Sequence, residues 1–269
     1  MADEDQADWA AKGIDISVPS IARTYDVVLN GKDNFAVDRA FVDQIVTTIP
    51  EIYDVATYNR EVLGRGVKFL VEQGVRQFLD LGSGLPTVRN THQVAQELAP
   101  ESRVVYVDND PIVLVHGKAL LAENERTGVV SADVRATAEV LDSPQVTALI
   151  DWTEPVCVML VGILHHLHDD DDPQGIVDAY LARAVPGSYL FITSFCASSD
   201  EAREAEKSYL GLLGTGRFRT VEEITAWFDG LELLEPGVVP NPLWRPAGPV
   251  GTDLTVGQKL IYGGIARKS

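Results

Sequence analysis

Short apolar runs alternate with amphipathic stretches along most of the chain, from Val75 onward. The runs have the length of buried strands, and the stretches between most of them have the apolar spacing of helices. Buried strands that alternate with helices indicate a parallel sheet with helices on both faces. The expected strands are 77–81, 103–107, 127–132, 156–161, 188–193, 231–234 and 259–266, and the expected helices are 88–98, 111–121, 134–141, 175–184 and 220–228.

The two ends of the chain depart from this alternation. No full helix is expected between the last two strands, so the final strand should return antiparallel to its neighbour. The first part of the chain instead has helical patterns from Ser20 to a turn at Asn30, and over 36–48 and 55–72. We therefore predict an α/β, Rossmann-like domain over 75–269, with a seven-stranded and mostly parallel sheet, preceded by an N-terminal arm and helical lid over 1–74.

The segment after the first expected strand is rich in glycine, and it reads Phe78-Leu79-Asp80-Leu81-Gly82-Ser83-Gly84-Leu85-Pro86-Thr87. In open α/β sheets, ligands bind where the first strand ends and the first helix begins. Gly82 and Gly84 leave the backbone open to close approach, because neither carries a side chain. Thr87 stands where the dinucleotide fingerprint has its third glycine, and Asp80 is also foreign to that fingerprint. Both departures argue against a nicotinamide cofactor.

A carboxylate ends the second expected strand, at Asp108 in the stretch Val104-Val105-Tyr106-Val107-Asp108-Asn109-Asp110. An acid at this position can accept hydrogen bonds from both hydroxyls of a ribose. Asp108 also lies at about the spacing from Gly84 that the fold requires. The glycine pair and this acid together predict a nucleoside-binding site. The alternative is that the glycines serve a tight turn and that Asp108 caps the following helix.

These segments resemble motifs I and II of class I S-adenosylmethionine-dependent methyltransferases. A wider set of residues is similar to an actinobacterial S-adenosyl methyltransferase family, which was once called a domain of unknown function. This resemblance covers nearly the whole chain. The set is Arg23-x-Tyr25-Asp26-x-x-Leu29-x-Gly31-Lys32-Asp33-Asn34-Phe35-Ala36-x-Asp38, Asn59-Arg60, Gln77-Phe78-Leu79-Asp80-x-Gly82-x-Gly84-Leu85-Pro86-Thr87, Asn90-Thr91-His92 and Tyr106-Val107-Asp108. The resemblance implies a Rossmann-like methyltransferase fold with S-adenosylmethionine as its cofactor, and it implies no particular methyl acceptor.

The resemblance also implies roles for residues at successive strand ends. They are Asp80, Gly82, Ser83, Gly84 and Asp108 for the methionine and ribose parts of the cofactor, Asn109, Asp133 and Val134 for the adenine, and Val161 and Ile163 beside the transferable methyl group. The Asn/Asp-Pro-Pro-aromatic motif of amino-methylating enzymes is absent after the fourth expected strand. The similar Asn241-Pro242-Leu243-Trp244 lies far from that strand, so we interpret it as a loop.

A polar cluster interrupts the apolar faces of the N-terminal helical segment, and we expect it to close over the cofactor. Tyr25, Lys32, Asn34 and Arg60 are the candidates for its lining. A lysine beside the methionine carboxylate would form a charge-assisted hydrogen bond. The alternative is that Gly31 and Asn34 only shape a turn while Tyr25 packs in the core. Arg60 likewise either lines the lid over the cofactor or has only a structural role.

Histidines and aspartates gather in the stretch His165-His166-Leu167-His168-Asp169-Asp170-Asp171-Asp172. Both residue types bind metals, but four acids in a row are typical of a solvated helix start, where capping and the helix dipole favour them. We therefore expect no metal site. Because histidine titrates near neutral pH, His165 or His166 is a candidate general base on the acceptor side. Otherwise the two histidines only shape the acceptor pocket.

Composition narrows the class of partner and the compartment. The formal net charge is −18, from 40 acidic and 22 basic side chains, which would repel a phosphate backbone, so we expect no nucleic-acid partner. Small molecules or basic proteins are easier partners, although the acidity would by itself keep the protein soluble. Cys157 and Cys196 lie in apolar stretches and are not expected to pair. Without a signal-peptide pattern or a long apolar run, we expect a cytoplasmic protein and no membrane partner.

The predicted activity is methyl transfer from S-adenosylmethionine to an oxygen or nitrogen nucleophile of an unidentified small molecule. The expected reaction is an in-line displacement, in which the protein mainly aligns nucleophile, methyl group and sulfur. A non-catalytic protein that senses S-adenosylmethionine or another nucleoside is the alternative from a different class. A nicotinamide oxidoreductase is a weaker alternative with the same fold.

Overall fold

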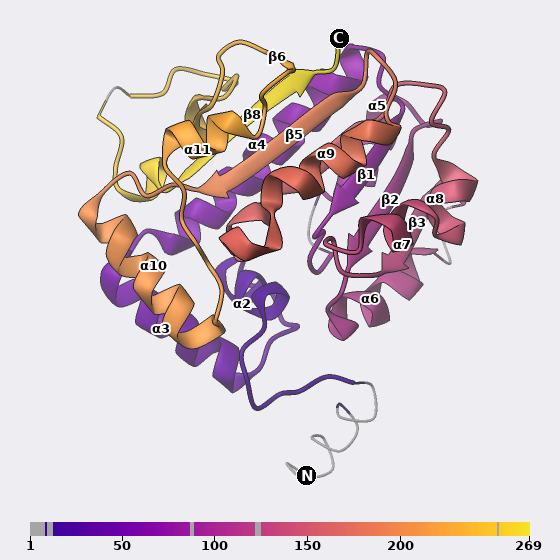
Figure 1. The fold of residues 1–269 in the computed structure, drawn as a ribbon. Coiled ribbons are helices and arrows are strands. Elements are labelled where there is room, and N and C mark those ends of the chain that lie inside the picture. The colour runs from indigo at the N-terminus through magenta and orange to yellow at the C-terminus, as the bar shows by residue number, and fades with distance from the viewer. Residues whose placement is uncertain (1–8, 10–12, 87–88, 122–124, 252) are drawn as a thin grey trace.

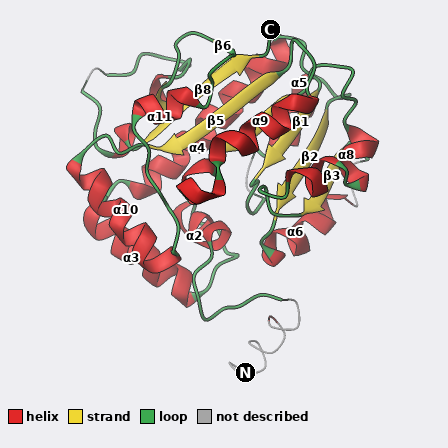
Figure 2. Cartoon of the chain, viewed as in Figure 1, coloured by secondary structure: helices red, strands yellow, loops and turns green. Residues whose placement is uncertain are grey.

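The computed structural model describes residues 9, 13–86, 89–121, 125–251 and 253–269. A single mixed sheet lies between layers of helices (Figures 1 and 2). The helices are α2 (Ile21–Val28), α3 (Ala36–Thr48), α4 (Ile52–Glu72), α5 (Thr91–Leu98), α6 (Pro111–Leu121), α7 (Thr137–Leu141), α8 (Pro144–Leu149), α9 (Pro173–Arg183), α10 (Asp200–Leu213) and α11 (Val221–Ala226). The strands are β1 (Gln77–Leu81), β2 (Arg103–Asp108), β3 (Thr127–Ser131), β4 (Cys157–Val161), β5 (Tyr189–Phe195), β6 (Glu232–Leu233), β7 (Val239–Pro240) and β8 (Ile261–Arg267).

The strand order places a crevice at the ends of the central strands. The order is β3-β2-β1-β4-β5-β8-β6, with β7 paired to β8 beside this path. The pairs among β3, β2, β1, β4 and β5 are parallel, whereas β8 runs antiparallel to β5, β6 and β7. From β1 the chain adds β2 and β3 on one side, and it then crosses back to add β4 and β5 on the other side of β1. The direction of the crossovers thus reverses between β1 and β4. At such a switch point, the carboxyl ends of neighbouring strands surround the usual ligand site of an open α/β sheet.

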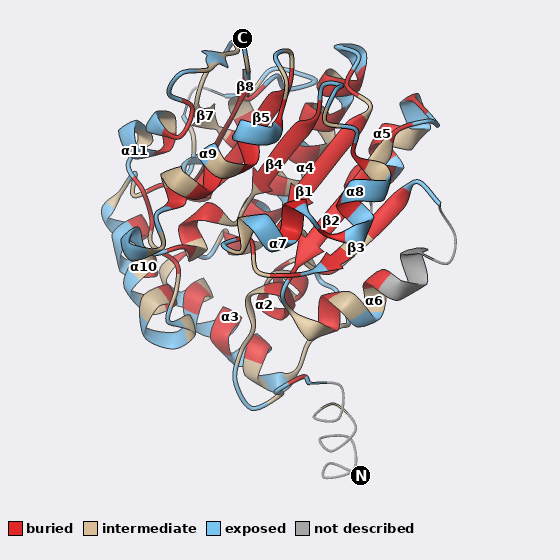
Figure 3. Cartoon of the chain, turned by 45° about the vertical axis from the view of Figure 1, so that its right-hand side comes forward, coloured by how far each residue is buried: buried red, intermediate tan, exposed pale blue. Residues whose placement is uncertain are grey.

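Apolar side chains fill both faces of the sheet, and the central strands β1, β2, β4 and β5 are largely buried in Figure 3. On one face, α4 and α5 pack against residues such as Phe78 and Phe191. On the other face, α7, α8, α9 and α11 pack against residues such as Leu79 and Ile192. Burial on both sides explains why the parallel strands are continuous apolar runs in the sequence rather than alternating ones.

A third apolar cluster lies beyond the sheet, where α2, α3 and α10 pack together (Figure 1). It joins Phe41 and Ile45 of α3 to Tyr209 of α10 and to Phe195 at the end of β5. The first turns of α4 contribute to the same cluster, so this helix connects the cluster to the sheet. The cluster forms an apolar wall beside the strand ends.

The predicted fold class is confirmed, with β8 as the antiparallel strand, but some elements differ from the expectation. Helices α8 and α10 and strand β7 were not expected, so the sheet has eight strands over the described residues rather than the seven predicted, and the expected strand 231–234 is reduced to the two residues of β6. Helix α10 buries only Ala202, Ala205 and Tyr209 over its 14 residues, so it has no wide apolar stripe. The sequence features that mark this helix are instead its two caps, Ser199 at the start and Gly214, in a left-handed conformation, at the end.

The predicted boundary at residue 74 falls just after α4, which shares the core of the sheet. The division of the chain into two domains at this point therefore stays a prediction. None of the helices in the described part of the chain is long and apolar enough to cross a membrane. Cys157 and Cys196 are buried free thiols, as their apolar surroundings in the sequence predict.

Candidate active site

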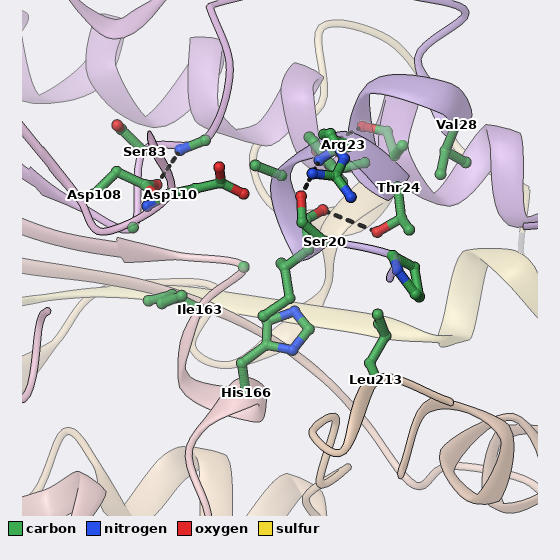
Figure 4. Close-up of a pocket in the computed structure, with 18 of the residues that line it drawn as sticks. Ser20, Arg23, Thr24, Val28, Ser83, Asp108, Asp110, Ile163, His166 and Leu213 are labelled. Atoms are coloured by element: carbon green, nitrogen blue, oxygen red, sulfur yellow. Dashed lines mark hydrogen bonds between the residues drawn. The ribbon is translucent and has the colours of Figure 1, made fainter. Parts of the chain in front are cut away.

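One cavity of about 520 Å³ lies at the carboxyl ends of β1, β2 and β4. Figure 4 shows side chains from the strand ends, from α2 and from α10 around it. The residues that the sequence predicted and that line the cavity are Tyr25, Arg60, Asp80, Gly82, Ser83, Gly84, Asp108, Asn109, Val161, Ile163, His165 and His166. The crevice that the strand order predicts is therefore a real cavity.

The glycine loop after β1 has backbone conformations that favour glycine. Gly82 and Gly84 have φ angles of 71° and 66°, in the left-handed region that is costly for a residue with a side chain. The N–H of Gly82 donates to the carbonyl of Val107 at 2.8 Å, which ties the loop to β2. A Cβ at Gly82 would lie 2.5 Å from Cγ1 of Ile163, whereas a Cβ at Gly84 would meet nothing within 4 Å. Gly82 thus permits close packing, and Gly84 leaves space for a ligand.

Two backbone donors hold the Asp108 carboxylate at the end of β2. Oδ2 accepts from the N–H of Gly84 at 2.8 Å (Figure 4), and Oδ1 accepts from the N–H of Asp110 at 2.9 Å. The side chain is 9% exposed, and burial raises the pKa of Asp108 despite these two bonds. Each carboxylate oxygen can accept two hydrogen bonds. Asp108 therefore keeps acceptor capacity for a ligand hydroxyl.

A second buried carboxylate, Asp80 of β1, lies beside the cation Arg60. Oδ2 of Asp80 accepts the hydroxyl of Thr91 at 2.7 Å. Burial raises the pKa of Asp80 to about 6, and the Thr91 hydrogen bond and the Arg60 charge oppose this rise. Arg60 of α4 also lines the cavity and donates through Nη2 to the carbonyl of Arg89 at 2.9 Å. Arg60 thus brings a positive charge to the strand-end part of the cavity.

Of the three residues predicted around the adenine, Asn109 lines the cavity, but Asp133 and Val134 do not. Nδ2 of Asn109 donates to Oδ2 of Asp133 at 3.2 Å, and the same carboxylate pairs with Arg135 at 2.7 Å. Val134 is buried, and its carbonyl accepts the Tyr180 hydroxyl at 2.8 Å. Asp133 thus supports Asn109 in this structure, and its contact with adenine stays a prediction.

The part of the N-terminal segment that borders the cavity lies nearer the N-terminus than the sequence predicted. Tyr25 lines the cavity, but Lys32 and Asn34 do not. Lys32 is exposed, because the turn after α2 faces solvent, and Asn34 donates to Oδ2 of Asp26 at 2.8 Å. Asn34 therefore shapes this turn, which was the alternative left open by its sequence. Most of residues 13–25 line the cavity instead.

A buried ion pair and an apolar contact fix this N-terminal segment. Nε of Arg23 lies 2.9 Å from Oδ2 of Asp38, and the two side chains are 3% and 0% exposed. Ile14 packs in a small apolar cluster with Leu85, next to the glycine loop. The segment 13–25 is therefore anchored on both sides of the cavity that it borders.

The remainder of the cavity is largely apolar. Its wall comes from α2, α3, α4 and α10 and from the ends of β5 and β8, through Val28, Phe41, Val42, Ile45, Ile52, Val55, Phe195, Leu213 and Ile261. Tyr25 and Asn59 are polar groups in this region, and Asn59 donates to the Tyr25 hydroxyl at 3.2 Å. A ligand here would be held mainly by apolar contact.

His165 and His166 follow β4 in a short 3-10 turn and line the cavity. Nδ1 of His165 accepts from the N–H of Phe195 at 3.3 Å, and Nδ1 of His166 lies 2.8 Å from Oγ1 of Thr215. Burial lowers the pKa of His165 well below its usual value, and it lowers the pKa of His166 to about 3. Both rings are therefore neutral at pH 7 in this structure, unlike free histidines that titrate near neutrality.

Sequence reasoning missed a polar network behind the cavity and the contribution of α10. Oδ1 of Asn59 accepts the Thr193 hydroxyl at 2.7 Å and Nδ2 of Asn241 at 3.1 Å. Asn59 and Asn241 are 182 positions apart, so no local pattern could reveal the contact. Tyr209 and Leu213 were missed together with their helix.

A Rossmann-like sheet with a glycine loop after β1 and an acid at the end of β2 is the arrangement expected of a class I S-adenosylmethionine-dependent methyltransferase. The chain belongs to the S-adenosyl methyltransferase family, which matches residues 7–269. A crystal structure of a candidate methyltransferase from Thermobifida fusca is 49% identical, with a TM-score of 0.92 over 95% of this chain and 97% of that chain. A DUF574 family protein from Streptomyces avermitilis is 38% identical, with a TM-score of 0.91 over 95% and 99%.

Solved structures with lower sequence identity support the fold and nothing further. An O-methyltransferase family protein from Burkholderia thailandensis is 12% identical, with a TM-score of 0.51 over 83% of this chain and 62% of that chain. Among curated proteins, none matches the chain. The family confirms the resemblance seen in the motifs, the cofactor S-adenosylmethionine and the enzyme class. It does not identify the methyl acceptor.

We expect S-adenosylhomocysteine to slow amide hydrogen exchange over residues 13–25, because this segment borders the cavity. The turn at 30–34 should exchange as in the free protein, since Lys32 and Asn34 lie outside the cavity lining. Hydrogen exchange read by mass spectrometry, with and without the ligand, tests both statements. Protection at 82–84 and 108–110 serves as the control for binding. Protection at 82–84 and 108–110 without protection at 13–25 would show that the N-terminal segment does not respond to the ligand.

Proposed function

We propose that this methyltransferase moves the methyl group of S-adenosylmethionine to an oxygen or nitrogen nucleophile of an uncharged, mostly apolar small molecule. The observation that carries the proposal is a single cavity with two unlike parts. Asp80, Asp108 and the glycine loop line the part at the strand ends, and the third apolar cluster lines the other. A cofactor bound at the strand ends would share the cavity with an apolar acceptor.

The residues at the strand ends suit this cofactor. Gly84 leaves the backbone open to the ligand, and Asp108 has lone pairs for the two ribose hydroxyls. Asn109 also lines this part of the cavity and would contact the adenine. Arg60 lines the cavity, whereas Lys32 does not, and Arg60 would pair with the methionine carboxylate. The cavity volume, about 520 Å³, falls within the range of roughly 300–1,000 Å³ that small-molecule sites occupy.

The lining of the other part favours an uncharged acceptor. In the described residues, α3, β5 and α10 contribute only apolar or neutral side chains to the cavity, such as Phe41, Phe195 and Leu213. The Arg23 guanidinium, which also lines the cavity, is already paired with Asp38. A charged acceptor buried against such a wall would lose its hydration without gaining a partner, which costs several kcal/mol.

The protein's main task in this reaction is alignment. S-adenosylmethionine supplies a methyl group that its sulfonium already activates, so a bound nucleophile in line with the carbon–sulfur bond can react without further activation of that bond. The apolar wall would hold the acceptor and exclude water from it. His165 and His166 are two neutral polar groups of the lining that could bond to the nucleophile.

Turnover by two adjacent leucine variants tests the acceptor site. Leu213 lines the cavity, whereas its neighbour Leu212 is 42% exposed. We expect Leu213→Glu to lower methyl transfer by more than about tenfold, because it places a charge in the apolar part, and Leu212→Glu to leave it unchanged. The assay follows S-adenosylhomocysteine and radiolabelled product with neutral phenols, enols and aromatic amines.

The methyl-transfer assay should also include carboxylated and cationic analogues of these phenols, enols and aromatic amines. Preferential methylation of charged analogues would contradict the proposed acceptor class. Binding of S-adenosylmethionine with no turnover of any acceptor would instead favour the alternative function, a non-catalytic protein that senses S-adenosylmethionine.

A further inference from the structure

The two neighbouring histidines at the end of β4 face the same cavity with different partners. Their ring centroids are 4.3 Å apart, and both rings line the cavity. A neutral imidazole carries its proton on one nitrogen and a lone pair on the other, so the partner of one nitrogen decides what the other offers. The partners of Nδ1 therefore determine what each ring presents to a methyl acceptor.

The tautomer of His165 follows from its backbone partner. The N–H of Phe195 donates to Nδ1 at 3.3 Å, and a backbone N–H can only donate. Nδ1 of His165 therefore carries the lone pair, and the proton of the neutral ring lies on Nε2. Burial keeps the ring neutral, since it lowers the pKa of His165 well below the usual value. His165 is thus a hydrogen-bond donor at Nε2.

His166 differs because its Nδ1 meets a hydroxyl, which can donate or accept. Oγ1 of Thr215 lies 2.8 Å from Nδ1, and Nε2 of His166 has no hydrogen-bond partner within the described part of the chain. In Figure 4 the His166 ring points into the cavity near Leu213. If Thr215 accepts the Nδ1 proton, Nε2 presents a lone pair to the cavity.

The fold itself places Thr215 beside His166, although the two are 49 positions apart. Thr215 stands between Gly214 and Gly216, whose φ angles are 69° and 107°. Nε2 of His168 donates to the carbonyl of Gly214 at 2.9 Å, which ties this turn to the residues after β4. A Cβ at Gly216 would lie 2.5 Å from Cβ of Tyr209, so the glycine lets the turn pack closely on α10. The hydroxyl is therefore part of a packed turn.

We propose that Thr215 is a positioning residue that accepts the Nδ1 proton of His166, so that His165 and His166 stand in opposite tautomers and offer the methyl acceptor one donor and one lone pair. This inference rests on the proposed function, because a nucleophile that carries a proton needs a lone pair to receive it. The acceptor class that fits is a molecule with a hydroxyl or N–H nucleophile next to a carbonyl or similar oxygen. The neighbouring oxygen would accept from Nε2 of His165.

The proton and electron balance of the transfer is simple. The electron pair of the nucleophile forms the new bond to the methyl carbon, and the electrons of the carbon–sulfur bond pass to sulfur. The proton of the nucleophile moves to Nε2 of His166 and then to solvent. A ring with a pKa of about 3 is a weak base, so His166 takes up the proton as the forming bond to the methyl carbon makes the nucleophile acidic, and it then releases the proton readily. Thr215 touches neither substrate nor cofactor in this scheme and acts only through His166.

Nitrogen-15 NMR of the protein bound to S-adenosylhomocysteine tests the inference at pH 7. The chain has five histidines, and His166→Gln assigns the signals of that ring. We expect a protonated Nε2 at His165 and a protonated Nδ1 at His166. Thr215→Val should move the proton of His166 to Nε2, since valine cannot accept it, whereas Thr215→Ser should keep the wild-type tautomer. The signals of His165 should stay unchanged in both variants, which controls for folding.

A protonated Nε2 at His166 in the wild-type protein would overturn the inference, and so would an unchanged His166 in a folded Thr215→Val protein. The tautomers are read without turnover. Failure of the methyl-transfer assay would therefore contradict the proposed function and leave the tautomer result standing, and a failed tautomer result would leave the proposed function intact.

Discussion

Asp108→Ala is expected to weaken the binding of S-adenosylmethionine by about 10- to 150-fold, which corresponds to about 1.5–3 kcal/mol for hydrogen bonds to a charged group. The carboxylate has lone pairs left for the ribose after it accepts the N–H groups of Gly84 and Asp110. Its removal also frees the N–H of Gly84, so the glycine loop loses one of its anchors. Titration calorimetry with S-adenosylmethionine and S-adenosylhomocysteine measures the change.

The free energy of unfolding of the ligand-free protein should change much less than the binding energy. Burial raises the pKa of Asp108, which means that the free protein pays to keep this carboxylate charged. Asp108→Asn is the matched variant, because it keeps the shape and one acceptor oxygen while it removes the charge. We expect its affinity to lie between those of wild type and alanine. An unchanged affinity together with a collapsed melting temperature would show that Asp108 is structural.

The sheet could be predicted because each central strand has only one way to bury its side chains. All five residues of β1 are buried, so the apolar run in the sequence corresponds directly to a strand covered on both faces. By contrast, β6 has two residues, neither of them buried, and exists because β8 offers an edge to pair with. Pairing with a distant strand leaves little pattern in the short segment itself, which is why its length was overestimated.

The strand-end part of the cavity could be predicted for a similar reason. Gly82, Gly84 and Asp108 lie at the ends of two adjacent parallel strands, so strand pairing brings them together. The apolar part of the cavity is assembled from segments far apart in the chain, and no local pattern marks it. Residue type alone also does not separate Lys32 from Arg60: the turn that carries Lys32 faces solvent, whereas Arg60 of α4 lines the cavity.

Gly82→Ala is expected to lower the free energy of unfolding by about 2–5 kcal/mol. The φ angle of 71° is a left-handed conformation that costs an alanine about 1–2 kcal/mol. The added Cβ would also lie 2.5 Å from Cγ1 of Ile163, and such overpacking typically costs about 1–3 kcal/mol. The affinity for S-adenosylmethionine should fall as well, because Ile163 lines the cavity and must move. Urea unfolding and calorimetry measure the two effects.

Gly84→Ala is the matched control for the contact with Ile163. Its φ angle of 66° imposes nearly the same backbone strain, but its Cβ would meet nothing within 4 Å. The difference in unfolding free energy between the two variants therefore isolates the steric contact. Ile163→Ala in the Gly82→Ala background should recover part of that difference, because it removes Cγ1 and Cδ1, two of the three nearest atoms. Equal destabilisation by the two glycine variants, with no recovery in the double variant, would show that Gly82 is needed only for its backbone conformation.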